Sequence, residues 1–196
     1  MCLRNNKVLK FFFIFVFCQS SYLNASDNQN TKVIDYLNKL RFFSASFIQN
    51  ENTSVSDGEI FIGDKRIRVE YNNPEKILII LDKDKAMYYN YELDEDEFFN
   101  PKDTSAWFFF DIFFNPEFFY DSEIIEGNNY LELIKKGLYE QEDYQIKIIF
   151  ENNPFVIRKI ILDQNDRSLK LSVFDHKYDN SYNKDFFKLI NPIFFD

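Results

Sequence analysis

Residues 104–119 read TSAWFFFDIFFNPEFF, the most apolar stretch of the chain outside its first twenty residues. Within the run WFFFDIFF, the single polar side chain is Asp111. Thr104 is a suitable N-cap and Pro116 a suitable stop, so the stretch predicts a helix of about two to three turns. A helix that is apolar on nearly every face must be buried, or must contact something apolar outside the chain. The sequence leaves both interpretations open: a core helix, or the wall of a cavity for an apolar ligand.

The beginning of the chain carries the pattern of a secretory signal peptide. Its first ten residues hold three basic side chains and no acidic one. Residues 11–18, FFFIFVFC, form an apolar run that is too short to cross a bilayer as a helix. Small and polar residues follow, and Ala25 suits the position before the cut. We therefore expect residues 1–25 to be a cleaved signal peptide and residues 26–196 to form one secreted domain.

Both cysteines lie within this leader. Cys18 ends the apolar run, where the lipidated cysteine of a lipoprotein would stand, but the residue before it is the large Phe17 instead of a small one. We favour cleavage after Ala25, which removes Cys2 and Cys18 together. A mature chain without thiols excludes thiol catalysis, disulfides and cysteine-based metal sites.

The sequence is acidic, with 32 Asp and Glu against 23 Lys and Arg and a net charge of −9. Nucleic acids and anionic membrane surfaces bind basic patches, so we expect no nucleic-acid partner. The charge instead keeps an aromatic-rich protein soluble and steers it toward basic partners.

After residue 40 the hydrophobic period changes from that of a helix to that of a strand. Residues 31–40 place four apolar side chains on one helical stripe: Val33, Tyr36, Leu37 and Leu40. Residues 66–71, RIRVEY, alternate apolar and charged side chains, which indicates a strand with one wet face. Similar segments follow with short turns between them, which predicts about nine or ten strands. The acidic run 94–97 reads as a solvated loop.

These patterns predict a mainly β, α+β fold in which an antiparallel meander curls into a barrel or half-barrel. Helical sequence occurs near residues 31–40 and 103–115, and these two segments are the material available to cover the concave face of the sheet. The sequence contains no linker and no internal repeat, which again predicts a single domain.

The residues that catalysis needs are sparse. The one histidine, His176, stands among charged residues, and the four glycines form no phosphate-binding loop. Carboxylates are abundant, but no isolated pair suggests a hydrolase. We therefore expect no enzyme activity, no metal ion and no cofactor.

The apolar residues of the strands instead favour an apolar ligand. Eight of them could line a cavity for hydrocarbon chains under the aromatic helix: Phe47, Phe61, Ile67, Val69, Tyr71, Ile79, Met87 and Tyr89. The same residues would serve equally well as an ordinary filled barrel core, and periodicity does not separate the two interpretations.

The order of motifs resembles the periplasmic outer-membrane lipoprotein carrier family, LolA, from about residue 32 to the C-terminus. After the signal peptide and a short helix come segments similar to the family's F-x-A-x-F-x-Q strand, its second strand, its R-F-x-Y-x-x-P strand and its D-G-K-x-L-W-x-Y hairpin: residues 44–49, 58–62, 68–74 and 82–90. Residues 101–114 fall where the family places a lid helix, and residues 160–171 resemble its late hairpin.

This resemblance implies an unclosed antiparallel β-barrel, or half-barrel, covered by a lid of short α-helices. It also implies a monomeric periplasmic carrier that binds the acyl chains of lipoproteins. Such a carrier moves them from an inner-membrane ABC-type release complex to an outer-membrane receptor. The alternative is a lipid-sensing or protein-interaction module on the same fold, without carrier activity.

The resemblance assigns lid residues to the aromatic helix: Trp107, Phe108, Phe110, Phe113 and Phe114. The family usually has Arg-Pro in the loop before its R-F-x-Y strand, and that arginine hydrogen-bonds to the lid. Here the loop is Gly63-Asp64-Lys65-Arg66, without proline. Lys65 and Arg66 are therefore the candidates to lock the lid. We hypothesise that residues 107–114 fill the cavity when no ligand is bound and that acyl chains displace them.

Overall fold

The structure is a computed structural model that describes residues 23–63 and 65–195. In this part of the chain, eleven strands form one antiparallel sheet with the order β6-β5-β4-β3-β2-β1-β11-β10-β9-β8-β7. The strands are β1 (Phe43–Glu51), β2 (Ser54–Gly63), β3 (Arg66–Asn73), β4 (Ile77–Leu81), β5 (Ala86–Asn90), β6 (Glu95–Phe99), β7 (Glu123–Glu126), β8 (Tyr130–Tyr139), β9 (Glu142–Asn152), β10 (Phe155–Gln164) and β11 (Arg167–Lys177).

The helical segments are short except for the first. They are α1 (Leu23–Asn38), α2 (Trp107–Phe114) and the 3-10 turns η1 (Leu40–Phe42), η2 (Pro101–Asp103), η3 (Pro116–Phe119) and η4 (Pro192–Phe195). The predicted signal peptide lies outside the described residues apart from the start of α1 at Leu23. No described helix has the length and apolarity that a membrane span requires.

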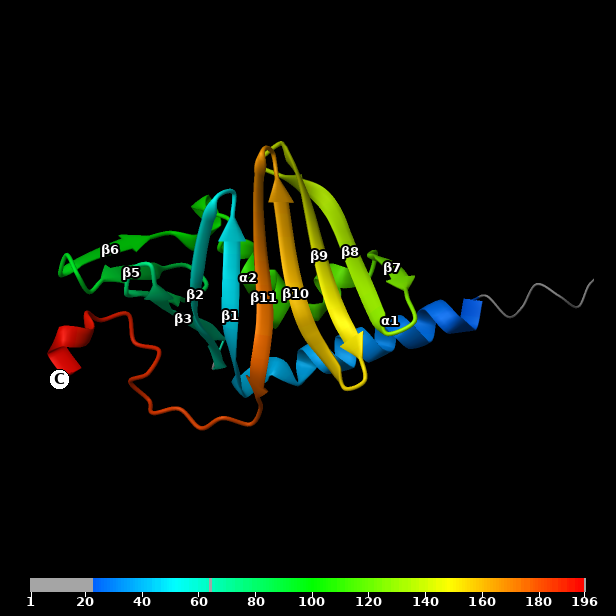
Figure 1. The fold of residues 1–196 in the computed structure, drawn as a ribbon, viewed down its shortest axis with the longest axis horizontal. Helices are drawn as coiled ribbons and strands as arrows, with labels where there is room; N and C mark the ends of the chain where they lie inside the picture. Colours follow the sequence, from blue (N-terminus) through cyan, green and yellow to red (C-terminus); the bar gives the residue numbers. More distant parts are fainter. Residues whose placement is uncertain (1–22, 64, 196) are drawn as a thin grey trace, which may run out of the picture.

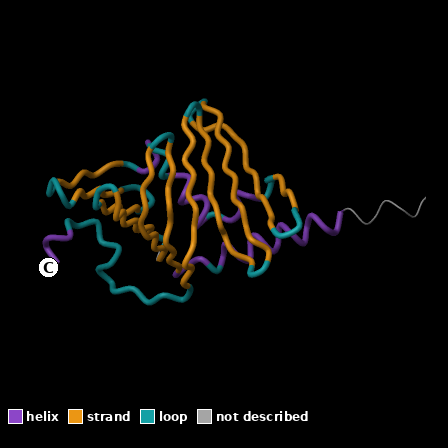
Figure 2. The backbone as a smooth tube through the Cα atoms, in the orientation of Figure 1, coloured by secondary structure: helices purple, strands orange, loops and turns teal. Residues whose placement is uncertain are grey.

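The sheet is not closed, because β6 and β7 are its two edges. This confirms the predicted fold class of a half-barrel with a helical lid. The first six strands form one meander and the last five form another, and β11 pairs with β1 to join them. The chain therefore runs from one edge of the sheet to the other between β6 and β7, and this connection carries α2. Figure 1 shows α1 and α2 together behind the sheet, and Figure 2 shows the same placement of the helical segments.

The acidic run that was predicted to be a loop is partly a strand. Residues 95–97 belong to β6, which pairs with β5 so that Phe98 lies opposite Met87. The prediction was wrong because three carboxylates in a row mask the period of a strand, and an edge strand can keep them in water.

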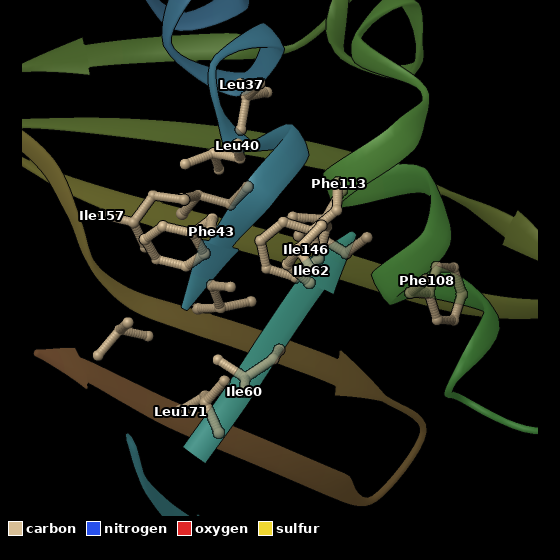
Figure 3. Packing of buried hydrophobic residues seen from close by; sticks show 14 of the residues in the cluster. Leu37, Leu40, Phe43, Ile60, Ile62, Phe108, Phe113, Ile146, Ile157 and Leu171 are labelled. Carbon is tan, nitrogen blue, oxygen red and sulfur yellow. The ribbon is translucent and has the colours of Figure 1, made fainter. Parts of the chain in front are cut away.

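The main core lies between the sheet and the helices. The predicted stripe on α1 is confirmed, since Val33, Tyr36, Leu37 and Leu40 are all buried. Figure 3 shows Leu40 above Phe43 and Ile157, while Phe113 of α2 points toward Ile62 and Ile146.

Tyr36 ties α1 to the sheet. Its hydroxyl accepts a hydrogen bond of 3.2 Å from the backbone N–H of Ile157, beside the irregular register between β9 and β10. Its ring meets Phe150 and Phe155 edge-on at 5.7 and 5.5 Å. One side chain thus supplies a polar and an aromatic anchor for the helix.

The outer face of β2–β5 is covered by the chain that follows β11. Phe186 packs edge-on against Phe61 with ring centroids 5.1 Å apart, and its carbonyl accepts a 2.8 Å hydrogen bond from Arg68. Leu189 packs on a second apolar cluster that contains Met87 and Tyr89. Strands β4 and β5 are therefore buried on both faces, and the C-terminal segment covers part of the outer face of this half of the sheet.

Candidate functional site

A cavity of about 220 Å³ lies between the inner face of the sheet and the chain that leads into α2. We call it the inner pocket. Its walls are almost entirely apolar and come from β1–β4, β11, the end of β6 and the start of the lid: Phe47, Gln49, Ile60, Ile67, Val69, Tyr71, Ile79, Leu81, Phe99, Thr104, Ser105, Ala106, Phe109, Leu169 and Leu171.

Five of the eight cavity residues predicted from the sequence line the inner pocket: Phe47, Ile67, Val69, Tyr71 and Ile79. Strand parity explains why they meet. Side chains directly opposite one another in paired strands share a face, and Ile60, Val69 and Ile79 stand opposite one another across β2, β3 and β4. The alternation in residues 66–71 therefore identified the inner face of β3 correctly.

The other three, Phe61, Met87 and Tyr89, lie on the outer face, so placing them in the cavity was wrong. The register gives the reason. Phe61 stands opposite Arg68, one residue out of step with the inner Val69. Ile79 stands opposite Tyr88, which turns Met87 and Tyr89 to the other side of β5. A shift of one residue reverses the face of every side chain in a strand. Because β5 carries apolar side chains on both faces, its sequence does not show which face is the inner one.

Several pocket residues were not predicted from the sequence. Leu169 and Leu171 come from the far end of the chain and reach the pocket through the pairing of β11 with β1. Gln49 ends the segment 44–49 that resembles the family's F-x-A-x-F-x-Q strand, and it stands opposite Leu171. The alternation within each strand shows which of its residues share a face. It does not show which strands pair with β1, so it could not bring these residues together in one pocket.

A polar pair lies at one end of this apolar wall. The Tyr71 hydroxyl donates a 2.9 Å hydrogen bond to Oε1 of Gln49. Burial raises the pKa of Tyr71 to about 12, the negative charge of Glu51 adds to the rise, and the bond to Gln49 opposes it. The phenol is thus neutral at ordinary pH, and the pair is the main hydrogen-bonding feature among the sheet residues of the pocket wall.

The lid helix α2 is buried on most sides, as predicted for residues 104–119. Phe108, Phe110, Ile112 and Phe113 are buried, and the rings of Phe108 and Tyr144 lie 4.7 Å apart. Within α2, the residue that lines the inner pocket is Phe109, which was not among the predicted lid residues. Four residues that were, Trp107, Phe110, Phe113 and Phe114, line a second hollow on another side of the helix.

The helix is shorter than its capping signals predicted. Thr104 does not cap α2 directly, because the helix begins at Trp107 with Ala106 in the cap position. Thr104 instead organises the turn before it: its Oγ1 donates to the carbonyl of Pro101 at 3.0 Å and accepts from the N–H of Ala106 at 3.3 Å. The predicted stop at Pro116 is confirmed, since the helix ends at Phe114.

The lid segment is held through Lys102 and not through the predicted locking residues. The Tyr139 hydroxyl of β8 donates a hydrogen bond to the backbone carbonyl of Lys102. The ammonium group of Lys102 pairs with Asp84, in the turn between β4 and β5, at 2.7 Å. The lid segment is thereby connected to both halves of the sheet.

Arg66, one of the two candidate locking residues, pairs through its guanidinium Nε with Asp82 at 2.8 Å in the neighbouring turn. Lys65 occupies a left-handed turn position with φ of 59° and lies at the second hollow beside the lid. Its side chain forms no hydrogen bond to the lid within the described residues. The shortened loop therefore binds the next turn of the sheet instead of the helix.

Asp111, the single acidic residue of the helix, is half-buried. Burial raises the pKa of its carboxyl, while a 3.3 Å hydrogen bond from Asn115 and the charge of Lys135 oppose the rise. An ionisable group in an otherwise apolar helix makes full burial of the lid costly.

Solved structures share this fold at low sequence identity. The fold is similar to part of MucB. The chain matches the crystal structure of MucB with a TM-score of 0.51 at 13% identity, over 84% of this chain and 62% of that one. An uncharacterized conserved protein from Thermus thermophilus matches with a TM-score of 0.49 at 10% identity, over 82% of this chain and 96% of that one.

MucB has also been solved in a complex with MucA from Pseudomonas aeruginosa, which matches with a TM-score of 0.47 at 14% identity over 84% of this chain and 60% of that one. The chain thus spans about three fifths of the MucB structures, at 62% and 60% of their lengths. No family model and no curated protein sequence matches this chain. At this identity the likeness to MucB concerns the fold alone.

Proposed function

We propose that this protein is a periplasmic carrier that binds the acyl chains of lipoproteins in the inner pocket. It would accept them from an inner-membrane ABC-type release complex and deliver them to an outer-membrane receptor. The observation that carries the proposal is the apolar pocket between the inner face of a half-barrel and an aromatic helix. The family resemblance of the motifs supports the direction of transport.

The size of the inner pocket implies that the lid must move. A cavity of about 150 Å³ accommodates benzene, which corresponds to roughly 25 Å³ per carbon. By this ratio the pocket of about 220 Å³ holds on the order of nine carbons. A 16-carbon acyl chain would therefore need the space that Phe109 and its neighbours occupy. This supports the hypothesis that the helix partly fills the cavity until a ligand displaces it.

The energetics suit reversible transfer. Burying an acyl chain releases roughly 0.8 kcal/mol per CH₂, or on the order of 12 kcal/mol for a 16-carbon chain. Part of this gain is offset by exposing the side chains of α2, each of which contributes about 1.5–3 kcal/mol when fully buried. The net affinity is then modest, and the carrier can release its cargo without an energy source of its own.

Depletion of the protein tests the carrier function directly. We expect depleted cells to retain lipoproteins in the inner membrane and the wild-type gene to restore their sorting. The purified periplasmic protein should also carry a lipoprotein after mild extraction. Normal sorting in depleted cells would refute the proposal.

The second candidate is a protein-interaction module, which the likeness to MucB favours because MucB forms a complex with MucA. A module of this kind would bind a protein partner without shuttling lipoproteins. Co-purification separates the two candidates: a carrier yields acylated lipoproteins, whereas an interaction module yields a partner whose binding does not depend on acylation.

A further inference from the structure

A second hollow, of about 1090 Å³, lies beside α2 on the side away from Phe109. We call it the outer groove. It is bounded by η1, the turn between β2 and β3, the turn between β4 and β5, and α2 with the residues after it. The residues that matter for its chemistry are Arg41, Lys65, Lys83, Trp107, Phe110 and Phe114.

An aromatic row forms the floor of the outer groove. Trp107 stacks on Phe110 with ring centroids 5.8 Å apart and an interplanar angle of 27°, and Phe110 lies 5.6 Å from Phe114. These three residues follow the spacing of one helical face. Trp107 and Phe114 are only partly buried, so the row offers an apolar strip to a ligand.

Three cationic side chains surround this strip. Arg41, Lys65 and Lys83 are exposed, and none of their side chains forms a hydrogen bond or ion pair with another described residue. They come from three different elements and converge on one hollow. Such cations are the groups that recognise a phosphate, arginine by paired hydrogen bonds and lysine as a point charge.

Three acidic residues also line the groove, and two of them pair with cations that do not belong to its lining. Asp82 pairs with Arg66 at 2.8 Å, and Asp84 pairs with Lys102 at 2.7 Å. Asp111 accepts a hydrogen bond from Asn115, and burial raises the pKa of its carboxyl while Asn115 and Lys135 oppose the rise. Two of the three carboxylates thus already have cationic partners other than the three on the rim. The lining therefore holds three cationic and three acidic side chains, and Arg66 and Lys102 pair with two of the carboxylates from outside it.

We propose that the outer groove binds a phosphate-headed amphiphile. Its headgroup would contact Arg41, Lys65 and Lys83, and its hydrocarbon chain would lie along Trp107, Phe110 and Phe114. This arrangement matches the usual design of ligand sites, an apolar surface with a few polar groups that fix the orientation of the ligand. The site is separate from the inner pocket and does not depend on the carrier function.

The test compares two amphiphiles with the same chain, dodecyl phosphate and dodecyl maltoside, below their micelle concentrations. Trp107 is the single tryptophan of the chain and lies in the groove, so its fluorescence reports on occupancy. We expect dodecyl phosphate to bind at least tenfold more tightly than dodecyl maltoside. Binding in the inner pocket alone would give the two compounds similar affinities. Equal affinities would therefore overturn the proposal without bearing on the carrier function.

The triple variant R41Q/K65Q/K83Q removes the basic rim, and we expect it to weaken dodecyl phosphate binding about tenfold while leaving dodecyl maltoside within twofold. The matched control is K136Q/K170Q/K177Q, which removes three exposed lysines elsewhere and the same net charge. We expect the control to bind like the parent. An equal loss in both triple variants would mean that total charge and not the groove determines binding, which also overturns the proposal.

Inorganic phosphate distinguishes a lipid headgroup from the free ion. We expect phosphate alone to leave the Trp107 spectrum unchanged at concentrations at which dodecyl phosphate saturates. If phosphate alone competes equally well, the groove is a free-anion site and the amphiphile proposal is wrong. The single variant R41Q, at an exposed residue, provides a check independent of the triple substitution, and we expect about a threefold loss.

Discussion

The strongest prediction concerns Phe109, whose side chain forms the contribution of α2 to the wall of the inner pocket. Phe109 is half-buried and is the residue of α2 that lines the pocket. We predict that Phe109→Ala enlarges the pocket and increases the affinity for long acyl chains. The same change should lower the stability of the unliganded protein.

The magnitudes follow from the size of the ring. Removing six ring carbons opens roughly 150 Å³, the volume that accommodates benzene, and extends the capacity from about nine to about fifteen carbons. Six more buried carbons are worth at most about 5 kcal/mol gross at roughly 0.8 kcal/mol each. We expect a net gain of at least tenfold in affinity, or about 1.4 kcal/mol. Replacing a fully buried phenylalanine by alanine lowers the free energy of unfolding by about 3–5 kcal/mol. Because Phe109 is only half-buried, Phe109→Ala should lower it by roughly 1–3 kcal/mol.

Calorimetric titration with octanoate and palmitate measures this effect. Octanoate already fits the parent pocket, so its affinity should change less than twofold in Phe109→Ala, whereas that of palmitate should rise at least tenfold. The matched control is Phe174→Ala, which removes the same ring from an exposed position on β11, outside the pocket lining. A folded Phe109→Ala protein that binds palmitate no better than the parent would refute the lid-displacement reasoning.

Three further predictions test the lid, the sheet and the polar pair of the pocket. Tyr139→Phe removes the hydrogen bond to the carbonyl of Lys102 and should cost about 0.5–1.5 kcal/mol, with faster amide exchange confined mainly to residues 101–114; unchanged exchange there would contradict the proposed attachment. Gly58→Ala places a Cβ 2.1 Å from the backbone oxygen of Glu70 and should lower the free energy of unfolding by at least about 2 kcal/mol in urea titration, whereas Ser56→Ala serves as a control in the same strand. Because the pKa of Tyr71 is raised to about 12 from 10.0, the protein should lose stability as the pH rises from 10 to 12, by up to about 2 kcal/mol from this residue; Tyr71→Phe should flatten that slope, and an unchanged slope would show that the phenol does not contribute.

Much of the fold was predictable because local patterns carried it. The stripe Val33, Tyr36, Leu37 and Leu40 identified the buried side of α1, and the alternation in residues 66–71 identified the inner face of β3. The motif resemblance then added the unclosed barrel and the position of the lid, which the sheet order confirms. Where one face of an element is clearly more apolar than the other, burial follows from the sequence directly.

The candidate site was less predictable because its walls depend on register. Residues 86–90, AMYYN, are apolar at both parities, and the pairing of Ile79 with Tyr88 decided that Met87 faces outward. The C-terminal segment then made that outward face a second core by covering it with Leu189. A segment far away in sequence thus determined the environment of residues whose own pattern was ambiguous.

The sequence by itself determined that residues 107–114 form a largely buried aromatic helix, because a run of that apolarity is unfavourable in water. Only the tertiary structure decided how the helix is used. The connection between the two sheet edges carries it behind the sheet, where Phe109 meets the inner pocket and Trp107 meets the outer groove. Hydrophobicity specifies that a side chain is buried, but chain topology and strand register specify what lies against it.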